Sequence, residues 1–575
     1  MSASTSVRFR TRLWVAGIAA TVIAPVGVTV ATSTARADQT YYVPITKAWT
    51  ISGHGYGHGH GMSQYGAQGA ALQGLNYADI VDFYYPGTSW SKVKGKVRVL
   101  IGSDWTSDLQ VKAQRGLTVR DLSDGTKWTL PTGDGVDRWR LTPAGDDSTA
   151  VQYRDDRGWH RWRIPGARVT FKSDGEFSAH GAMTLLVPSG SDVVGKRYRG
   201  ILRSVRPYKG ATVRDTVNVL NMDSYVKGVV PYEMPASWAQ QALRAQAVAA
   251  RTYAAWQRAQ NPKRYYQICD TTACQVYGGV AAEQTSSNQA VDGTVGKILT
   301  YQNRPAFTQF SASSGGWTSA GGVPYLPAKK DRYDGFSGNS VHNWSVQVSA
   351  SALERSHPEI GNLIDLRVTK RDGHGQWNGR ALQIVLDGSD GTAYLTGDDF
   401  RWQYALRSNW FTIAPTPIIE RWRKLGAAKS GLGNVRSGEY AVDTGSAQRF
   451  MHGKIFWNAA TGAREVKGAI LVAYRTFGGP ESSLGWPRTG ILNAPGNGRK
   501  VRFEGGRIYN KASAGAHVMY GPIPHRWSKE GGPGGWLGYP TTNVTAINGG
   551  QRMRFEAGVI IWKRATNTFI VRKTS

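Results

Sequence analysis

The sequence predicts an α+β protein, in which a strand-rich domain with one main helix precedes a smaller β-rich repeat domain. Residues 91–220 alternate apolar and polar positions between frequent Gly, Asp and Pro, as in the run Lys96-Val97-Arg98-Val99-Leu100, which is typical of short antiparallel strands. Residues 238–260 space their alanines and leucine as one long helix does. Beyond Pro415 the composition changes and the chain repeats itself.

The N-terminus predicts export. Arg8, Arg10 and Arg12 precede an apolar run over 13–30, and Ala35-Arg36-Ala37 provides a small-residue cleavage site, so residues 1–37 are expected to be a signal peptide. An uncleaved membrane anchor is the alternative, because the apolar run is long enough to span a thin bilayer. We expect a secreted, cell-wall-associated protein whose main domain covers 38–415.

The formal net charge of +30 is spread along the 575 residues. Such a charge indicates anionic partners, and outside a cell the envelope supplies them. Nucleic acid is not expected as a partner, because the signal peptide removes the protein from it and the sequence has no motif that reads bases.

The two cysteines, Cys269 and Cys274, enclose a short loop. In an exported chain such a pair fits a disulfide. The alternative is a zinc ion, whose remaining ligands would come from His54, His58 or His60.

The main helix has two predicted ends. Ser237 is expected to cap its N-terminus, and Asn261-Pro262 to end it. Two adjoining stripes of the helix should face the core; they consist of Ala242, Ala245 and Ala249, and of Leu243, Gln246 and Ala250.

Residues 416–575 contain three copies of one pattern. Leu-Gly recurs at 432, 484 and 537, each time ten residues after an aromatic residue and ahead of a Phe-x-x-Gly-x-Ile run. The aromatic residues are Trp422, Tyr474 and Trp527. Each copy is expected to form one small strand-rich unit whose apolar face is covered by its neighbours.

These copies resemble LGFP repeats, through Leu484-Gly485-Trp486-Pro487 and Leu537-Gly538-Tyr539-Pro540, with a degenerate first copy. The resemblance implies binding to cell-wall polymers, with a plain spacer as the alternative. Trp and Tyr side chains of the repeats either stack on sugars or belong to the core.

Glu233 is a candidate acid, and a surface or capping residue is the alternative that its sequence position alone leaves open. It lies between apolar neighbours in Val229-Val230-Pro231-Tyr232-Glu233-Met234-Pro235, just ahead of the main helix. Apolar surroundings raise the pKa of a carboxyl group and a helix N-terminus lowers it, so the sequence leaves the balance open.

A Gly-His run over 53–62 places glycine at every second position, so the backbone can approach a ligand closely. In an extended segment, His58 and His60 would share a face. They would then line a cleft or hold a metal, or they would satisfy backbone groups of the loop.

Together with the segment around Glu233, several motifs resemble the SpoIID/LytB domain. They are the run 242–254, Cys274-Gln275-Val276-Tyr277-Gly278-Gly279, Ser313-Ser314-Gly315-Gly316, the run 57–67 and Tyr84-Tyr85-Pro86-Gly87-Thr88. The resemblance implies a lytic transglycosylase of peptidoglycan with Glu233 as its acid and base. The residues that it implies for substrate binding are His58, His60, Ser63, Gln64, Tyr65, Arg251, Gln275, Tyr277, Ser313 and Ser314.

One carboxylate suffices for that chemistry, because the attacking 6-hydroxyl belongs to the sugar itself. No organic cofactor is expected, since no nucleotide-binding fingerprint is present. Zinc stays open, although Ala273 stands where the family often has histidine before its second cysteine.

The order of the motifs departs from the family, because the Gly-His run comes first here instead of near the end of the domain. A circular permutation explains this order and predicts that residues 50–90 pack beside 300–415. Two other functions compete with the enzyme. One is a non-catalytic enhancer of a partner amidase, and the other is a purely structural wall-binding protein.

Overall fold

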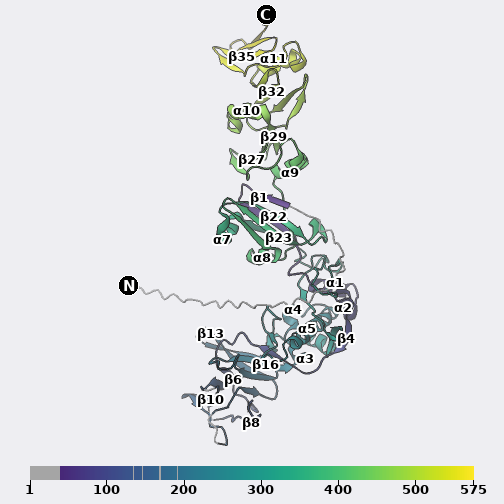
Figure 1. The fold of residues 1–575 in the computed structure, drawn as a ribbon, viewed down its shortest axis with the longest axis vertical. Coiled ribbons are helices and arrows are strands. Elements are labelled where there is room, and N and C mark those ends of the chain that lie inside the picture. The colour runs from purple at the N-terminus through teal and green to yellow at the C-terminus, as the bar shows by residue number, and fades with distance from the viewer. Residues whose placement is uncertain (1–38, 134, 146, 167–169, 191, 575) are drawn as a thin grey trace, which may run out of the picture.

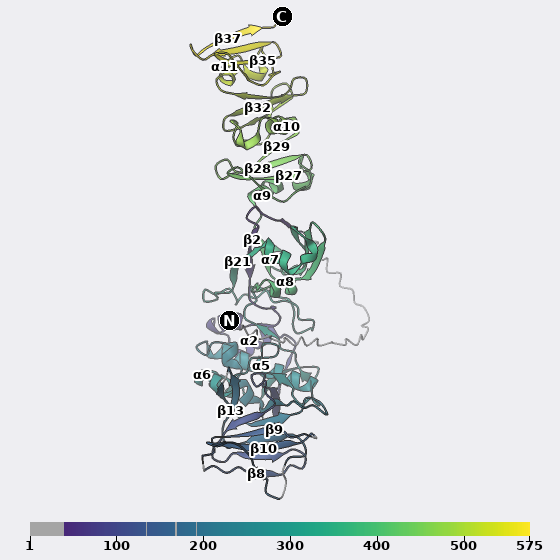
Figure 2. The same cartoon turned by 90° about the vertical axis from the view of Figure 1, so that its left-hand side faces the viewer.

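A computed structural model describes residues 39–574 except 134, 146, 167–169 and 191. The predicted signal peptide lies outside the described residues. In Figures 1 and 2 the C-terminal repeats form a column, the strand-rich part occupies the opposite end, and helices lie between them. In the described part of the chain, we find no helix that is both long and apolar enough to cross a membrane.

Two sheets form the strand-rich part, and the α+β prediction is confirmed. The six-stranded sheet has the order β11 (Gly158–Arg161), β10 (Thr149–Asp155), β9 (Arg138–Pro143), β6 (Leu109–Lys112), β13 (Met183–Ser189) and β14 (Asp192–Tyr198). The seven-stranded sheet has the order β17 (Ile268–Cys269), β5 (Lys96–Leu100), β16 (Asp215–Asn221), β15 (Ile201–Val205), β12 (Gly175–Ser178), β7 (Thr118–Asp121) and β8 (Lys127–Thr129). Alternate apolar side chains of both sheets, such as Val111 and Phe177, are buried in one core.

The main helix is α5 (Gln240–Gln260), and both of its predicted stripes are buried. Around it lie α1 (Gln64–Leu72), α2 (Tyr77–Tyr84), α3 (Met222–Lys227), α4 (Val230–Glu233) and α6 (Thr285–Asp292). The predicted cap was wrong. A turn closed by the Trp238 N–H on the Pro235 carbonyl precedes Ala239, and Ala239 has extended backbone and occupies the capping position instead of Ser237.

The N-terminal segment pairs with strands from the far end of the domain. β2 (Ala48–His54) lies between β21 (Asn343–Ser349) and β25 (Phe411–Ile413), and β1 (Gln39–Tyr42) pairs with β22 (Leu363–Arg371). The Gly-His run continues this arrangement, because β3 (Met62–Ser63) pairs with β20 (Phe310–Ser311). The predicted packing of 50–90 beside 300–415 is confirmed.

Each repeat is one helix followed by a four-stranded antiparallel sheet. The helices are α9 (Pro417–Lys424), α10 (Gly468–Thr476) and α11 (Ile523–Lys529). The sheets are β26 to β29 (Tyr440–Val442, Gly445–Phe450, Gly453–Trp457 and Arg464–Lys467), β30 to β33 (Leu492–Ala494, Gly498–Arg502, Gly506–Lys511 and Gly515–Tyr520), and β34 to β37 (Thr545–Ile547, Gly550–Phe555, Gly558–Lys563 and Thr568–Lys573).

The repeated aromatic residue and the Leu-Gly pair form one structural unit. The Trp422 and Trp527 indoles and the Tyr474 hydroxyl donate to the carbonyls of Gly433, Gly538 and Gly485, at 3.0, 3.1 and 2.7 Å respectively. Tyr474 and Trp527 are fully buried, so these positions belong to the core and are not available to stack on sugars. Apolar side chains of adjacent repeats share cores, as predicted.

Candidate active site

A cavity of about 380 Å³ lies where the Gly-His run, α4 and α5 meet the loop after β17. This volume is within the range of small-ligand sites. The lining residues are His58, Gln64, Glu233, Tyr253, Thr272, Ala273, Cys274, Gln275, Val276, Gln309, Phe310, Ser311 and Ala312. The cavity therefore combines segments that lie more than two hundred residues apart in the sequence.

Glu233 is the one carboxylate among the described residues that line this cavity. It ends the short helix α4, and the extended backbone of Met234 turns the chain away before α5 begins. The Gln64 amide donates to its Oε2 at 3.2 Å, and the Val276 backbone also bonds to it. Burial raises the pKa of Glu233 and outweighs both hydrogen bonds, which lower it. The balance that the sequence left open is thus decided by desolvation.

His58 is a neutral hydrogen-bonding group. Burial, together with the charges of His60, Arg380 and Arg401, lowers the pKa of His58 to about 3. Its Nδ1 accepts the backbone N–H of His60 at 2.9 Å. Because a backbone N–H can only donate, the proton of the neutral ring is on Nε2. His58 can therefore offer an N–H donor to a ligand without bringing a charge.

His60 lies beside His58 and contacts Gln309, but it is not itself part of the cavity lining. Its ring centroid lies 4.7 Å from that of His58, and its Nδ1 is 3.3 Å from the Gln309 side-chain oxygen. Burial lowers the pKa of His60, so it too favours the neutral form. His60 does not line the cavity, whereas its partner Gln309 does.

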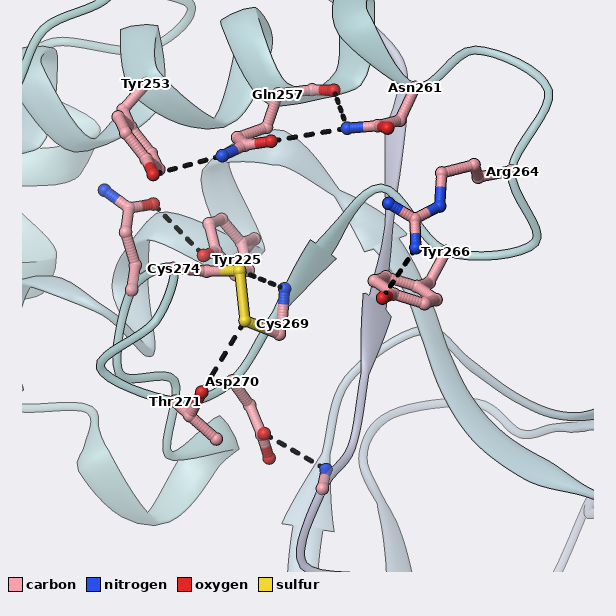
Figure 3. Close-up of a disulfide and its surroundings, with 12 residues drawn as sticks. Tyr225, Tyr253, Gln257, Asn261, Arg264, Tyr266, Cys269, Asp270, Thr271 and Cys274 are labelled. Atoms are coloured by element: carbon pink, nitrogen blue, oxygen red, sulfur yellow. Dashed lines mark hydrogen bonds between the residues drawn. A yellow bond between two sulfur atoms is a disulfide. The ribbon is translucent and has the colours of Figure 1, made fainter. Parts of the chain in front are cut away.

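The two cysteines form a disulfide beside the cavity (Figure 3). It closes the loop after β17, and the residues from Thr272 to Val276 make one wall of the cavity. Gln275 belongs to this wall, but its amide is already occupied: its oxygen accepts from the Tyr225 hydroxyl at 3.1 Å, and its nitrogen donates to the Ala250 carbonyl at 3.4 Å. Gln275 therefore holds the wall against α3 and α5.

The disulfide also bears on the zinc alternative. Both sulfur atoms are bonded to each other, so this form offers no thiolate ligands. His54 is held elsewhere, between the side chains of Asn343 and Gln376 at 2.7 and 2.8 Å. Within the residues that the structure describes, no three His, Cys, Asp or Glu side chains gather as a metal site would require.

Three serines expected to bind substrate are buried in a polar network instead. Ser63 and Ser313 donate to Asp334 at 2.6 and 2.8 Å, and Ser314 donates to Asp331 at 2.8 Å. Ser63 also caps α1. The serines are at most 1% exposed, and their hydroxyls join the 60s segment to the 310–340 segment. The structure thus corrects their predicted role.

The pKa values of the two aspartates in this network are shifted in opposite directions. Burial raises the pKa of Asp331 to about 6, and the nearby charge of Asp334 adds to the shift. At Asp334 burial acts in the same direction, but hydrogen bonds from His342, Ser63 and Ser313 outweigh it and lower the pKa. His342, with Nδ1 2.7 Å from Asp334, has its pKa raised by that bond.

The remaining predicted residues also lie outside the cavity. Arg251 is fully buried and forms an ion pair with Asp223 at 2.8 Å, and Tyr277 donates to Asn218 inside the core at 2.8 Å. Tyr65 packs edge-on against Trp238, with ring centroids 4.9 Å apart. Of the predicted substrate-binding residues, the structure brings His58, Gln64 and Gln275 together with Glu233.

Sequence reasoning missed Tyr253, Thr272, Gln309 and Ser311, which also line the cavity. Tyr253 follows Arg251 by two positions on α5, so it points to another side of the helix, and burial raises the pKa of its hydroxyl. No sequence signal marks Gln309 or Ser311, because they reach the cavity only through the pairing of β20 with β3.

Comparisons with known proteins match both parts of the chain. Residues 211–301 match the SpoIID family, described as Stage II sporulation protein, and this segment contains Glu233. Residues 432–482, 484–535 and 537–574 match the LGFP repeat.

Three curated relatives match parts of the chain. An uncharacterized protein of Brachyspira hyodysenteriae is 35% identical over 36% of this chain and 55% of its own length. Stage II sporulation protein D of Bacillus amyloliquefaciens is 30% identical over 34% of this chain and 61% of its own length. The amidase enhancer of Bacillus subtilis is 41% identical over 23% of this chain and 19% of its own length.

The chain thus spans less than two thirds of the length of each of these relatives. The matches agree with the motifs that surround Glu233 and with the repeated Leu-Gly units. This chain carries a SpoIID domain followed by C-terminal LGFP repeats.

Proposed function

We propose that this protein is a lytic transglycosylase that cleaves peptidoglycan glycan strands, with Glu233 as acid and then base. The observation that carries the proposal is a single, partly buried carboxylate of raised pKa that lines the cavity. A hydrolase of the usual kind needs a second carboxylate roughly 5–9.5 Å away. Among the described lining residues Glu233 has no such companion.

The reaction needs one proton carrier. Glu233 in its acid form donates its proton to the glycosidic oxygen as the bond to the anomeric carbon breaks. The resulting carboxylate accepts the proton of the same sugar's 6-hydroxyl, whose oxygen attacks the anomeric carbon and closes a 1,6-anhydro ring. The raised pKa keeps more of the acid form present near neutral pH, and the Gln64 amide stabilises the carboxylate after the proton has left.

The test incubates the parent protein and the near-isosteric Glu233→Gln variant with intact and with peptide-free glycan strands. We expect 1,6-anhydro ends, detected by mass spectrometry, from the parent, and a rate lower by about 10²–10⁴-fold in the variant. Equal rates for both proteins would contradict the role of Glu233. Matching thermal unfolding curves at low pH would show that the variant is folded.

Gln64→Leu gives a second test that keeps the carboxylate. The Gln64 hydrogen bond lowers the pKa of Glu233, so its removal raises that pKa further. The alkaline limb of the pH–rate profile should then move to higher pH. An unmoved limb would mean that Glu233 is not the group that titrates.

The second function is enhancement of a partner amidase, which the resemblance to an amidase enhancer over 139 residues favours. Under this hypothesis the parent and Glu233→Gln accelerate a wall amidase equally, and neither protein forms anhydro ends. In both functions we propose that the LGFP repeats keep the protein at the wall.

A further inference from the structure

The sheets of the repeats carry cations at matching places. In each repeat an antiparallel bridge ends on the phenylalanine of the repeated pattern. The bridges are Val435–Phe450, Pro487–Phe503 and Pro540–Phe555. The residue after the first partner therefore lies opposite the residue before the phenylalanine. The first cationic row is Arg436, Arg449 and Lys454, and the second cationic row is Arg488, Arg502 and Arg507. The corresponding places in the third repeat hold Thr541, Arg554 and Val559.

Register puts each row on one face of its sheet. Arg449 lies directly opposite Lys454, and Arg502 opposite Arg507, in antiparallel pairs. The backbone N–H groups of Arg436 and Arg488 donate to the carbonyls of Arg449 and Arg502 at 2.9 and 2.8 Å. Side chains directly opposite in such pairs are neighbours on the same face. Three cations therefore stand side by side in each of the first two repeats.

These cations are not neutralised by the protein. Arg436, Arg449, Arg488 and Arg502 are exposed. Throughout the described part of the chain, no carboxylate comes within 4.0 Å of the charged groups of either row, whereas Arg421 and Lys511 of the same repeats pair with Glu465 and Glu556. Like charges directly opposite destabilise a sheet. A bound anion would relieve that repulsion.

We infer that the cationic rows bind a linear polyanion of the wall, one with phosphate or carboxylate groups along its length. The rows are rich in guanidinium groups, whose planar forks match both oxyanions. Figure 1 shows the repeats stacked along the column, so the two rows belong to successive levels of it, and a polymer long enough to reach both gains from occupying both. The inference gives a chemical partner to the proposed retention at the wall, and it does not depend on the chemistry at Glu233.

The test uses the full-length mature protein and three soluble probes: poly(glycerol phosphate), polygalacturonate and neutral dextran. The third repeat supplies threonine and valine for two of the three places, and glutamine replaces the arginine between them, so the variants are R436T/R449Q/K454V for the first row and R488T/R502Q/R507V for the second. We expect one polyanion or both to bind, dextran to fail, and each variant to bind about tenfold more weakly. The tighter polyanion identifies phosphate or carboxylate as the group that the rows recognise.

A matched control removes three exposed cations from the helical side of the repeats, in R423Q/K429Q/R475Q. It changes the net charge by the same amount, so it should bind within about twofold of the parent if the rows form the site. Equal losses in the control and the row variants would overturn the inference, as would no binding of either polyanion at 50 mM salt. Cleavage of short soluble strands should be the same in all of these variants, which separates failure here from failure of the proposed reaction.

Discussion

The region around Glu233 and the C-terminal repeats are stabilised in different ways. In the repeats the same few apolar positions recur, and each copy packs against the next one in sequence. Around the cavity, distant segments are joined by buried polar groups, with Asp334 accepting from Ser63 and Ser313. Apolar packing tolerates small adjustments, whereas a buried polar network fixes its members in place only when every partner is present. The cavity region should thus be the less tolerant of substitution.

Asp334→Ala should destabilise the cavity region more than any other substitution considered for the two regions. The carboxylate is fully buried and also accepts the backbone N–H of Ser314 at 2.9 Å, so its loss leaves several donors and the His342 ring without this partner. We expect the free energy of unfolding to fall by about 3–5 kcal/mol. Denaturant unfolding measures this, with Asp156→Ala at an exposed carboxylate as the control. Similar midpoints for both variants would contradict the role assigned to the network.

Trp527→Ala should lower the free energy of unfolding of the third repeat by a comparable amount but leave the cavity region folded. The indole is fully buried beside Tyr509 and Phe555, and its replacement by alanine typically costs about 3–5 kcal/mol. Hydrogen exchange should show lost protection within 506–574 and unchanged protection within 39–415. Trp536→Ala, at a position 42% exposed, is the control with little expected effect. Lost protection around Glu233 would mean that the two regions unfold together.

Removal of the disulfide should have a smaller effect that centres on the cavity wall. For so short a closed loop, Cys269→Ser/Cys274→Ser should lower the free energy of unfolding by about 2 kcal/mol. The loosened wall carries Val276, which bonds to Glu233, so the KM for glycan strands should rise more than kcat falls. The check is steady-state kinetics of the parent with and without reductant beside the double variant. Reductant should not change the kinetics of the double variant, which has no disulfide. If it also leaves the kinetics of the parent unchanged, the disulfide does not control KM.

The smallest expected effect is on stability, because the ionised form of Glu233 destabilises the folded protein. Its pKa is raised in the folded state, so above the ordinary value of 4.5 the folded protein holds a proton that the unfolded chain releases, and stability falls as pH rises. Glu233→Gln removes this cost, so its Tm should exceed that of the parent at pH 7. The difference should vanish near pH 4, where the glutamate is protonated in both states. A constant difference across this range would contradict the raised pKa.

The sequence predicts the repeats more completely than it predicts the cavity region. The repeats were predictable because each depends on contacts within about fifty residues, and the aromatic, Leu-Gly and Phe positions recur in order. Glu233 and His58 were identified through their motifs, and α5 through its alanine spacing. Ser313 and Ser314 were misassigned because a serine in a motif looks alike whether it faces a ligand or a buried aspartate. Gln309 had no local signal, since a distant strand pairing brings it to the cavity.

The position of β2 between β21 and β25 has a consequence for the order in which the chain can fold. As synthesis or translocation delivers the chain from its N-terminus, residues 48–54 have no strand to pair with until residues 343–349 and 411–413 have also emerged. The segment that bears His58 depends on late residues as well, because the Gly57 N–H donates to the Arg407 carbonyl at 2.8 Å. A chain stopped before residue 407 would therefore lack a hydrogen-bond partner beside His58. The N-terminal strand β2 therefore gains its last partner only after nearly three quarters of the chain has been delivered, and the segment around His58 is completed late in folding.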